Sequence, residues 1–163
     1  MVAQFLNSFI RHADVVKIAN IAQVVNVIAP ILTRGDQLLK QSIYYVFKLF
    51  SEMKSGIALD LANNGSEYKT KTHGTVQYVD SSAILKKSEK KLVVFLVNRS
   101  AEKSIPVSIQ TSGLPRLKFE GGVIITHSDL KASNCFENPN NVIPESYDEI
   151  SLSDDEIRFD IPR

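Results

Sequence analysis

The stretch RHADVVKIANIAQVVNVIAP, from Arg11 to Pro30, decides how the rest of the chain is interpreted. Its apolar run, Val15 to Ile21, is shorter than the roughly 20 residues that a transmembrane helix needs, and polar side chains follow it. The preceding segment, 1–11, predicts a helix because apolar residues recur there at helical spacing. These residues are Val2, Phe5, Leu6, Phe9 and Ile10. A helix that leads into a buried strand is one step of a parallel α/β sheet. We therefore expect 15–21 to be the last strand of a parallel barrel, and the chain to begin within a larger fold.

A second helix is predicted from Gln41 to Met53, where apolar side chains form one stripe at helical spacing. The members of this stripe are Ile43, Val46, Phe47 and Phe50. A connection through Pro30 and Gly35 joins the expected strand to this helix. Residues 1–54 are thus predicted to be a helix-strand-helix unit, the last elements of an incomplete TIM-type barrel.

After residue 54 the pattern changes to short apolar runs that are separated by turn residues, which is typical of an antiparallel sandwich. The runs are GIALDL, TVQYV, SSAILKK, KLVVFLV, IPVSIQT, GGVIITH and EIRFDI. Leu92 to Val97 is apolar on both faces and is predicted to be the buried central strand. The polar stretch 128–153 is predicted to be a surface loop with one helical turn at 129–132.

The fold class that these patterns predict is mainly β. We expect a jelly-roll-like antiparallel β-sandwich over residues 55–163, preceded by the helix-strand-helix remnant of a (β/α)8 barrel.

Composition excludes some classes of partner. The 163 residues carry a net charge of +1 and have a sequence pI near 7.8, so there is no electrostatic case for nucleic acid or an anionic membrane. The single cysteine, Cys135, cannot form an internal disulfide, and no Cys/His spacing around it indicates a metal site. Localisation stays open, with the lone cysteine favouring the cytoplasm.

Six collinear segments resemble the C-terminal third of the family 51 α-L-arabinofuranosidases. Besides the opening stretch, they are QSIYYVFKLF, EYKTK, YVDSSAIL, VVFLVNR and HSDLKASNCFENPNNVIP. The resemblance implies a retaining glycosidase that removes terminal arabinofuranosyl residues, needs no cofactor and is often oligomeric. It also implies that EIRFDIPR ends where the closing strand of the sandwich begins, so the sandwich is expected to lack that strand.

The resemblance places both catalytic glutamates on earlier barrel strands, and this chain contains neither of their motifs. We therefore predict no catalytic residue on this chain, which should not hydrolyse glycosides alone. The family's glutamine in A-Q-x-V-N corresponds to Gln23, which is predicted to contact the bound arabinofuranose because an amide can both donate and accept hydrogen bonds. Asn20 and Asn26, on either side of it, are expected to stabilise the loop rather than bind sugar.

Other residues that invite a chemical interpretation are better explained by structure. His12 precedes Asp14 but falls on the barrel's stability face, and His73 and His127 lie in predicted sandwich loops. The aromatic stripe of the second helix, including Tyr44 and Tyr45, has the spacing of a packed face rather than of a sugar-stacking platform.

Two alternatives to the arabinofuranosidase hypothesis remain open. The chain could be a non-catalytic β-sandwich module that binds carbohydrate or another subunit, or a remnant without independent function. The expected partners are arabinofuranosyl oligosaccharides, together with either a second copy of the chain or the missing barrel portion.

Overall fold

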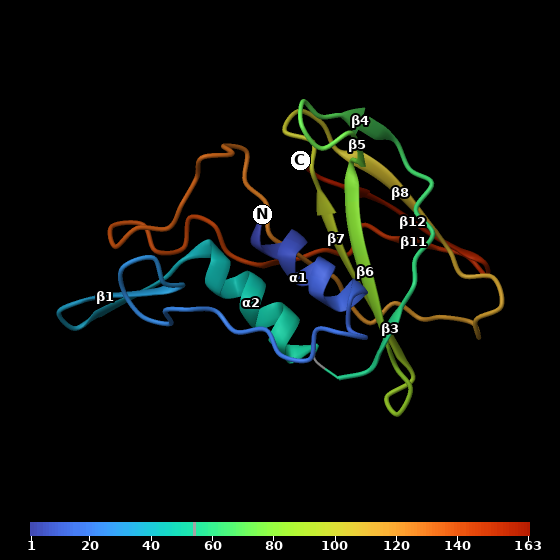
Figure 1. Cartoon of the computed structure of the whole chain (residues 1–163), viewed down its shortest axis with the longest axis horizontal. Coiled ribbons are helices and arrows are strands. Elements are labelled where there is room, and N and C mark those ends of the chain that lie inside the picture. Colours follow the sequence, from blue (N-terminus) through green and yellow to red (C-terminus); the bar gives the residue numbers. More distant parts are fainter. Residues whose placement is uncertain (54) are drawn as a thin grey trace.

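A computed structural model describes residues 1–53 and 55–163. Its N-terminal part contains helix α1 (Val2–Arg11), the hairpin of β1 (Ile31–Arg34) and β2 (Gln37–Lys40), and helix α2 (Ser42–Glu52) (Figure 1). Both helices form where the apolar spacing predicts them. Neither is long and apolar enough to cross a membrane, and no other helix of the described residues is either.

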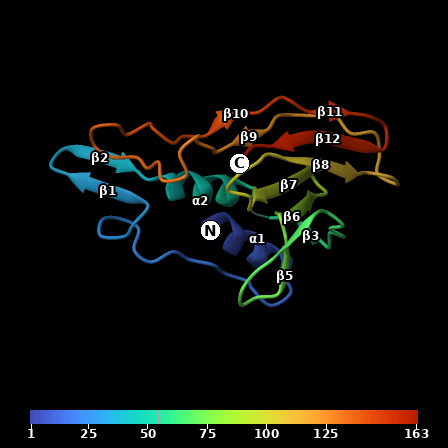
Figure 2. The ribbon, with the colours of Figure 1, turned by 90° about the horizontal axis from the view of Figure 1, so that it is seen from above.

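Two three-stranded antiparallel sheets make up most of the remainder. One has the order β3 (Ile57–Leu59), β6 (Val79–Lys86), β7 (Lys91–Asn98), and the other has the order β11 (Ser151–Leu152), β12 (Glu156–Ile161), β8 (Ile105–Gln110). Two small antiparallel pairs complete the described strands: β4 (Glu67–Lys69) with β5 (Thr75–Gln77), and β9 (Val123–Ile124) with β10 (Glu145–Ser146). Seen from above, the two larger sheets form successive layers (Figure 2). The predicted antiparallel β fold is confirmed.

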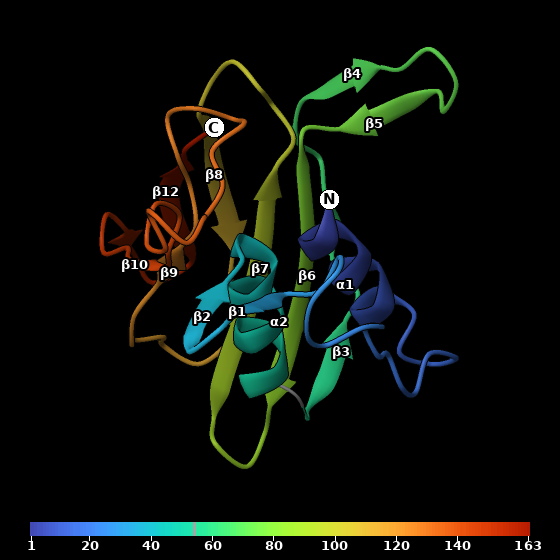
Figure 3. The same ribbon diagram turned by 90° about the vertical axis from the view of Figure 1, so that its left-hand side faces the viewer.

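Helices α1 and α2 lie across one face of β6 and β7 (Figure 3). Phe50 of α2 stacks on Phe95 of β7, with ring centroids 4.1 Å apart and an interplanar angle of 17°. This contact confirms a packing role for at least this member of the aromatic stripe. The hairpin of β6 and β7 has a continuous register from Val79 opposite Asn98 to Lys86 opposite Lys91.

The centre of this sheet is β6, and the prediction that Leu92–Val97 would be the buried central strand is wrong. Strand β6 pairs with both β3 and β7, and its Ser82 and Ala83 are buried. Strand β7 is half-buried along its whole length because it has a paired neighbour on one side only. The apolar residues of β7 are explained by its contacts with two elements, helix α2 and strand β12.

The predicted strand over 15–21 is absent, so the helix-strand-helix unit is corrected to a helix, an irregular segment, a hairpin and a helix. Residues 12–30 carry one isolated parallel bridge, Val25 with Ile31, and no strand. Val15 and Ile18 are 71% and 79% exposed. A strand needs a neighbour to satisfy its backbone hydrogen bonds, and none of the described residues lies beside 15–21 in that way.

The hairpin of β1 and β2 replaces what was expected to be a plain connection. Gly35 has φ +62° in its two-residue turn, a conformation that glycine adopts without steric cost. The loop 128–153 contains the short strands β10 and β11, and its predicted helical turn is a single turn closed by Ala132 N donating to Asp129 O at 3.1 Å. The predicted division at residue 54 falls on Lys54, which lies outside the described residues.

Gly56 is expected to be intolerant of a side chain. It has φ +139°, and a Cβ there would overlap Cγ2 of Ile84 in the central strand. Gly56→Ala should lower the free energy of unfolding by about 2 to 4 kcal/mol, measured by urea denaturation. Gly113 is the matched control because it has φ +84° and a Cβ there would meet no neighbouring atom, so Gly113→Ala should cost only about 1 kcal/mol of backbone strain. Equal losses for the two variants would contradict the packing argument.

Candidate functional site

Gln23, the predicted sugar contact, lies exposed in the irregular segment between α1 and β1. Asn20 is exposed in the same segment. Within residues 1–53 and 55–163, neither amide side chain makes a hydrogen bond to another residue. The structure therefore places Gln23 at an accessible position without enclosing it.

Asn26 holds the turn that follows Gln23. Its Oδ1 accepts from Thr33 N at 2.7 Å, its Nδ2 donates to Thr33 Oγ1 at 3.0 Å, and its backbone N donates to Ile31 O at 2.8 Å. Asn26 and Val27 have φ +63° and +59°, which is rare for residues other than glycine and unfavourable for a β-branched one. These contacts confirm the loop-stabilising role predicted for Asn26, and they fix the turn three residues beyond Gln23 to strand β1.

The loop from Asn134 to Val142 in turn holds the β1–β2 hairpin. Asn134 is 5% exposed, and its Nδ2 donates to Lys40 O at 2.9 Å and to Val142 O at 3.0 Å, while its Oδ1 accepts from Val142 N at 2.7 Å. Leu39 is buried in the hairpin beside Lys40 in the sequence. The nitrogen and the oxygen of this amide are thus both used, and Asn134 joins its own loop to a residue 94 positions earlier in the chain.

A second contact joins the same loop to the end of β1. Arg34 Nη1 and Nη2 each lie 3.0 Å from Glu137 Oε1, and the guanidinium carbon lies 4.2 Å from the ring centroid of Phe136. A hydrogen bond from its own backbone amide, followed by the hydrogen bond and charge of Arg34, holds the pKa of Glu137 below its ordinary value of 4.5. The pair is exposed, with side-chain exposures of 54% and 71%, so it contributes little to the stability of the fold.

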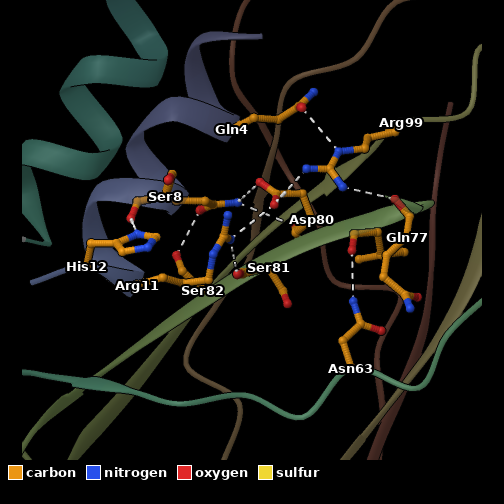
Figure 4. A network of polar contacts seen from close by, with 12 residues as sticks. Gln4, Ser8, Arg11, His12, Asn63, Gln77, Asp80, Ser81, Ser82 and Arg99 are labelled. Atoms are coloured by element: carbon orange, nitrogen blue, oxygen red, sulfur yellow. Dashed lines mark hydrogen bonds and ion pairs between the residues drawn. The ribbon is translucent and has the colours of Figure 1, made fainter. Parts of the chain in front are cut away.

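A buried polar network joins α1 to β6 (Figure 4). Asp80 is 4% exposed; its Oδ1 accepts a hydrogen bond from Arg99 Nη2 at 3.0 Å, and its Oδ2 accepts one from Asn7 at 2.9 Å. Arg11 Nη1 forms an ion pair with Asp80 Oδ1 at 3.1 Å and donates its hydrogen bond to Ser81 O at 2.6 Å. Ser82 Oγ donates to Asn7 Oδ1 at 2.8 Å. Because all the partners of Asp80 are side chains of this chain, the carboxylate anchors a helix and is not poised to attack or to protonate a substrate. Sequence reasoning missed this network.

His73 and His127 lie in loops, as predicted, and the ring nitrogens of His12 and His127 contact backbone groups. His12 ends α1, with Nδ1 2.8 Å from Ser8 O. His73 lies in the turn between β4 and β5, where its backbone N donates to Thr70 Oγ1 at 2.8 Å. His127 Nδ1 accepts from Asp129 N at 2.9 Å in the loop that follows β9.

Residues 1–53 and 55–163 contain no group of three or more His, Cys, Asp or Glu side chains that could hold a metal ion. Cys135 is an exposed free thiol.

An apolar groove opens between α1, the irregular segment, the end of α2 and the β3–β6 edge of the sheet. Its apolar lining includes Leu6, Phe9, Val16, Ile18, Phe47 and Phe50. Val16 and Ile18 of the irregular segment thus form part of the wall of this groove.

Comparison with known proteins assigns this architecture to one family. The family described as "Alpha-L-arabinofuranosidase C-terminal domain" matches residues 1–163. The chain is 34% identical over 155 residues to intracellular exo-alpha-(1->5)-L-arabinofuranosidase 1 of Bacillus subtilis (strain 168), covering 94% of this chain and 31% of that protein. It is 32% identical over 156 residues to the enzyme of the same type from Acetivibrio thermocellus, again covering 94% and 31%.

Solved structures agree. The GH51 arabinofuranosidase from Xanthomonas axonopodis pv. citri matches with a TM-score of 0.88 and 30% identity, over 99% of this chain and 32% of that chain. A family 51 α-L-arabinofuranosidase from Bifidobacterium longum matches with a TM-score of 0.88 and 25% identity, over 98% and 31%. The chain spans about a third of the length of the relatives that it matches.

The network around Asp80 should dominate the stability of the α1 packing. Asp80→Asn should lower the free energy of unfolding by about 2 to 4 kcal/mol, because it leaves two arginines against β6 without their counter-charge. Urea denaturation measures the loss. Asp154→Asn is the matched control, since Asp154 pairs with Arg116 at 3.4 Å on the surface and its loss should cost under about 0.5 kcal/mol. A loss for Asp80→Asn no larger than the control would refute the anchoring role.

Glu137 should titrate below 4.5, as followed by the NMR shift of its side-chain carboxyl carbon. In Arg34→Met the midpoint should rise part of the way towards 4.5, because the backbone hydrogen bond remains. A lowered folded pKa means that the pair contributes stability above the ordinary pKa and loses it as the pH falls through the lowered value. Arg116→Met, a remote surface arginine, should leave the midpoint of Glu137 in place. An unchanged midpoint in Arg34→Met would count against the ion pair.

Proposed function

The chain belongs to the family of α-L-arabinofuranosidase C-terminal domains, and on that premise we propose that it works as the C-terminal portion of a retaining α-L-arabinofuranosidase. The proposed enzyme removes terminal α-L-arabinofuranosyl residues from arabinan or arabinoxylan oligosaccharides and needs no cofactor. The observation that carries this proposal is the family match over the whole chain, joined to relatives that are named arabinofuranosidases.

In this proposal the chain does not supply the catalytic carboxyl groups. A retaining glycosidase needs two of them about 5 to 5.5 Å apart, one as nucleophile and one as acid and then base. Asp80, a buried carboxylate of this chain, is fully engaged by Asn7 and two arginines. The relatives are about three times as long as this chain, which leaves room in them for a catalytic barrel.

We also propose that residues 1–54 complete such a barrel and that residues 55–163 form the accessory β-sandwich. Two features support this division. The irregular segment has the composition of a buried strand yet exposes Val15 and Ile18, and the groove beside it is apolar. Leaving large apolar side chains exposed costs about 1.5 to 3 kcal/mol each compared with burying them. The proposed partner is therefore the barrel portion, beside which 15–21 would become a strand; a homo-oligomer of the assembled enzyme is the further expectation.

Gln23 is the proposed sugar contact. Active sites of barrel enzymes lie at the carboxyl ends of the strands, and Gln23 lies two residues after the end of 15–21. Its exposure and its position just before the fixed turn at Asn26 are compatible with presenting the amide to a ligand. We propose the cytoplasm as the location, because the relatives from Bacillus subtilis and Acetivibrio thermocellus are named intracellular enzymes.

Release of 4-nitrophenol from 4-nitrophenyl α-L-arabinofuranoside tests the proposal. The chain should be inactive alone and active when mixed with a separately made barrel portion, taken from the part of the Bacillus subtilis relative that precedes the matched segment. The barrel portion alone is the control. Activity of the chain alone would refute the assignment of catalysis to another portion, and an inactive mixture would favour a carbohydrate-binding module or a remnant.

Gln23→Ala should lower kcat/KM of the active mixture by about 10- to 100-fold, because the loss of a hydrogen bond to a sugar hydroxyl costs about 1 to 3 kcal/mol. Asn20→Ala removes another exposed amide from the same segment and should leave kcat/KM within about twofold. Steady-state kinetics of the two variants make the comparison. Equal effects would mean that Gln23 has no special contact with the substrate.

A further inference from the structure

The turn after Gln23 has a strained backbone and is held in place by contacts with strand β1. Asn26 and Val27 both have positive φ, and such conformations persist only where surrounding contacts over-determine them. Here the contacts come from β1: Thr33 bonds the Asn26 side chain and Ile31 bonds its backbone. The position of Gln23 therefore depends on where the β1–β2 hairpin is held.

The hairpin is held by a loop that is remote in the sequence. The loop from Asn134 to Val142 bonds Lys40 at one end of the hairpin, and its Phe136 and Glu137 engage Arg34 at the tip. Two views show this orange loop running alongside the cyan hairpin, beyond the end of α2 (Figures 1 and 2). Before this loop in the sequence, Arg163 donates to Ser128 O at 2.6 Å and Thr126 donates to Arg163 O at 2.8 Å.

We propose that the loop Asn134–Val142 is the positioning element for the sugar-contacting segment, acting on Gln23 through the β1–β2 hairpin, with Asn134 as its fixed anchor and the Arg34–Glu137 pair as its adjustable contact. This inference rests on the proposed role of Gln23 in sugar binding. Neither Asn134 nor Glu137 touches the substrate in this scheme. Both are positioning residues, and their effect reaches Gln23 along a continuous path of contacts: the loop to Arg34 and Lys40, the hairpin to Thr33, and Thr33 to Asn26.

The contact of Asn134 with Lys40 and the contact of Glu137 with Arg34 have different roles. Asn134 is buried and fully bonded, so it fixes the base of the hairpin as a rigid part of the domain. Glu137 is 71% exposed, and its pair with Arg34 sits at the turn, where a small change in angle displaces the strand that carries Thr33. A weak surface pair can thus alter substrate binding without altering global stability.

The test compares Glu137→Gln with Glu120→Gln. Glu120 is a matched control because it is an exposed glutamate that pairs with Lys91 at 3.0 Å. Neither of these residues belongs to the β1–β2 hairpin or to the loop 134–142. Glu137 is preferred to the buried Asn134 because an exposed ion pair contributes little to stability, so the fold should tolerate its removal. Hydrogen exchange of the Asn26 and Thr33 amides is measured on the full chain, and KM and kcat are measured on the mixture with the barrel portion.

The expected result is faster exchange at both amides, by about fivefold or more, together with a three- to tenfold rise in KM at nearly constant kcat for Glu137→Gln only. Glu137→Asp, which keeps the charge, should restore part of the loss in KM. Unchanged exchange would overturn the inference, and so would faster exchange without any kinetic change, since the loop would then hold the turn without positioning Gln23. An inactive mixture of the unaltered chains would instead refute the proposed function, and the inference with it.

Discussion

The packing of α1 depends on one buried carboxylate. Asp80 is buried near the start of the central strand β6, and removing a charge from water costs several kcal/mol unless partners replace the solvent. Two arginines and Asn7 do so: Asn7 and Arg11 come from α1, and Arg99 is the residue after β7. These partners fix both the rotation of α1 and its position along β6, because an apolar contact alone would let the helix slide. Arg11 is the last residue of α1, so the same carboxylate also fixes where the irregular segment begins.

The irregular segment is consequently fixed to the rest of the domain at both of its ends. Its start is fixed by Arg11 on Asp80, and its far end is fixed by Asn26 on Thr33. The side chains between these two points are mostly exposed. Strand structure is a property of pairs of chains, since an isolated strand leaves its backbone groups unpaired. The apolar composition of 15–21 therefore indicates that the segment can pair with a strand of another portion of the protein, although it forms no strand by itself. Because both of its ends are fixed, a neighbouring strand can approach it from only some directions.

Sequence patterns predicted the elements whose determinants are local. The stripes of α1 and α2, the β6–β7 hairpin and strands β8 and β12 all follow from spacing within about ten residues. Other features depend on distant partners and could not be found in this way. Asn7 meets Asp80 73 residues later in the chain, and Arg34 meets Glu137 after 103 residues. The β1–β2 hairpin was missed although Gly35 and Asp36 between two short apolar runs are a recognisable turn signal. The choice of Gln23 over Asn20 rests on the family resemblance and on its place after the expected strand 15–21, because no feature of the local sequence marks it as a ligand contact.

The Asp80 network and the Arg34–Glu137 pair differ in burial, and this difference affects which substitutions the domain can tolerate. The Asp80 network is enclosed, so loss of any partner strands a charge or an amide, and substitutions there act on folding. The contact of Arg34 with Glu137 is exposed, so water replaces a lost partner at little cost. Substitutions at Arg34 or Glu137 should therefore cost less stability than substitutions at Asp80, which holds α1 on the sheet. A domain that separates a buried anchor from an exposed contact in this way can vary the exposed contact with little loss of stability.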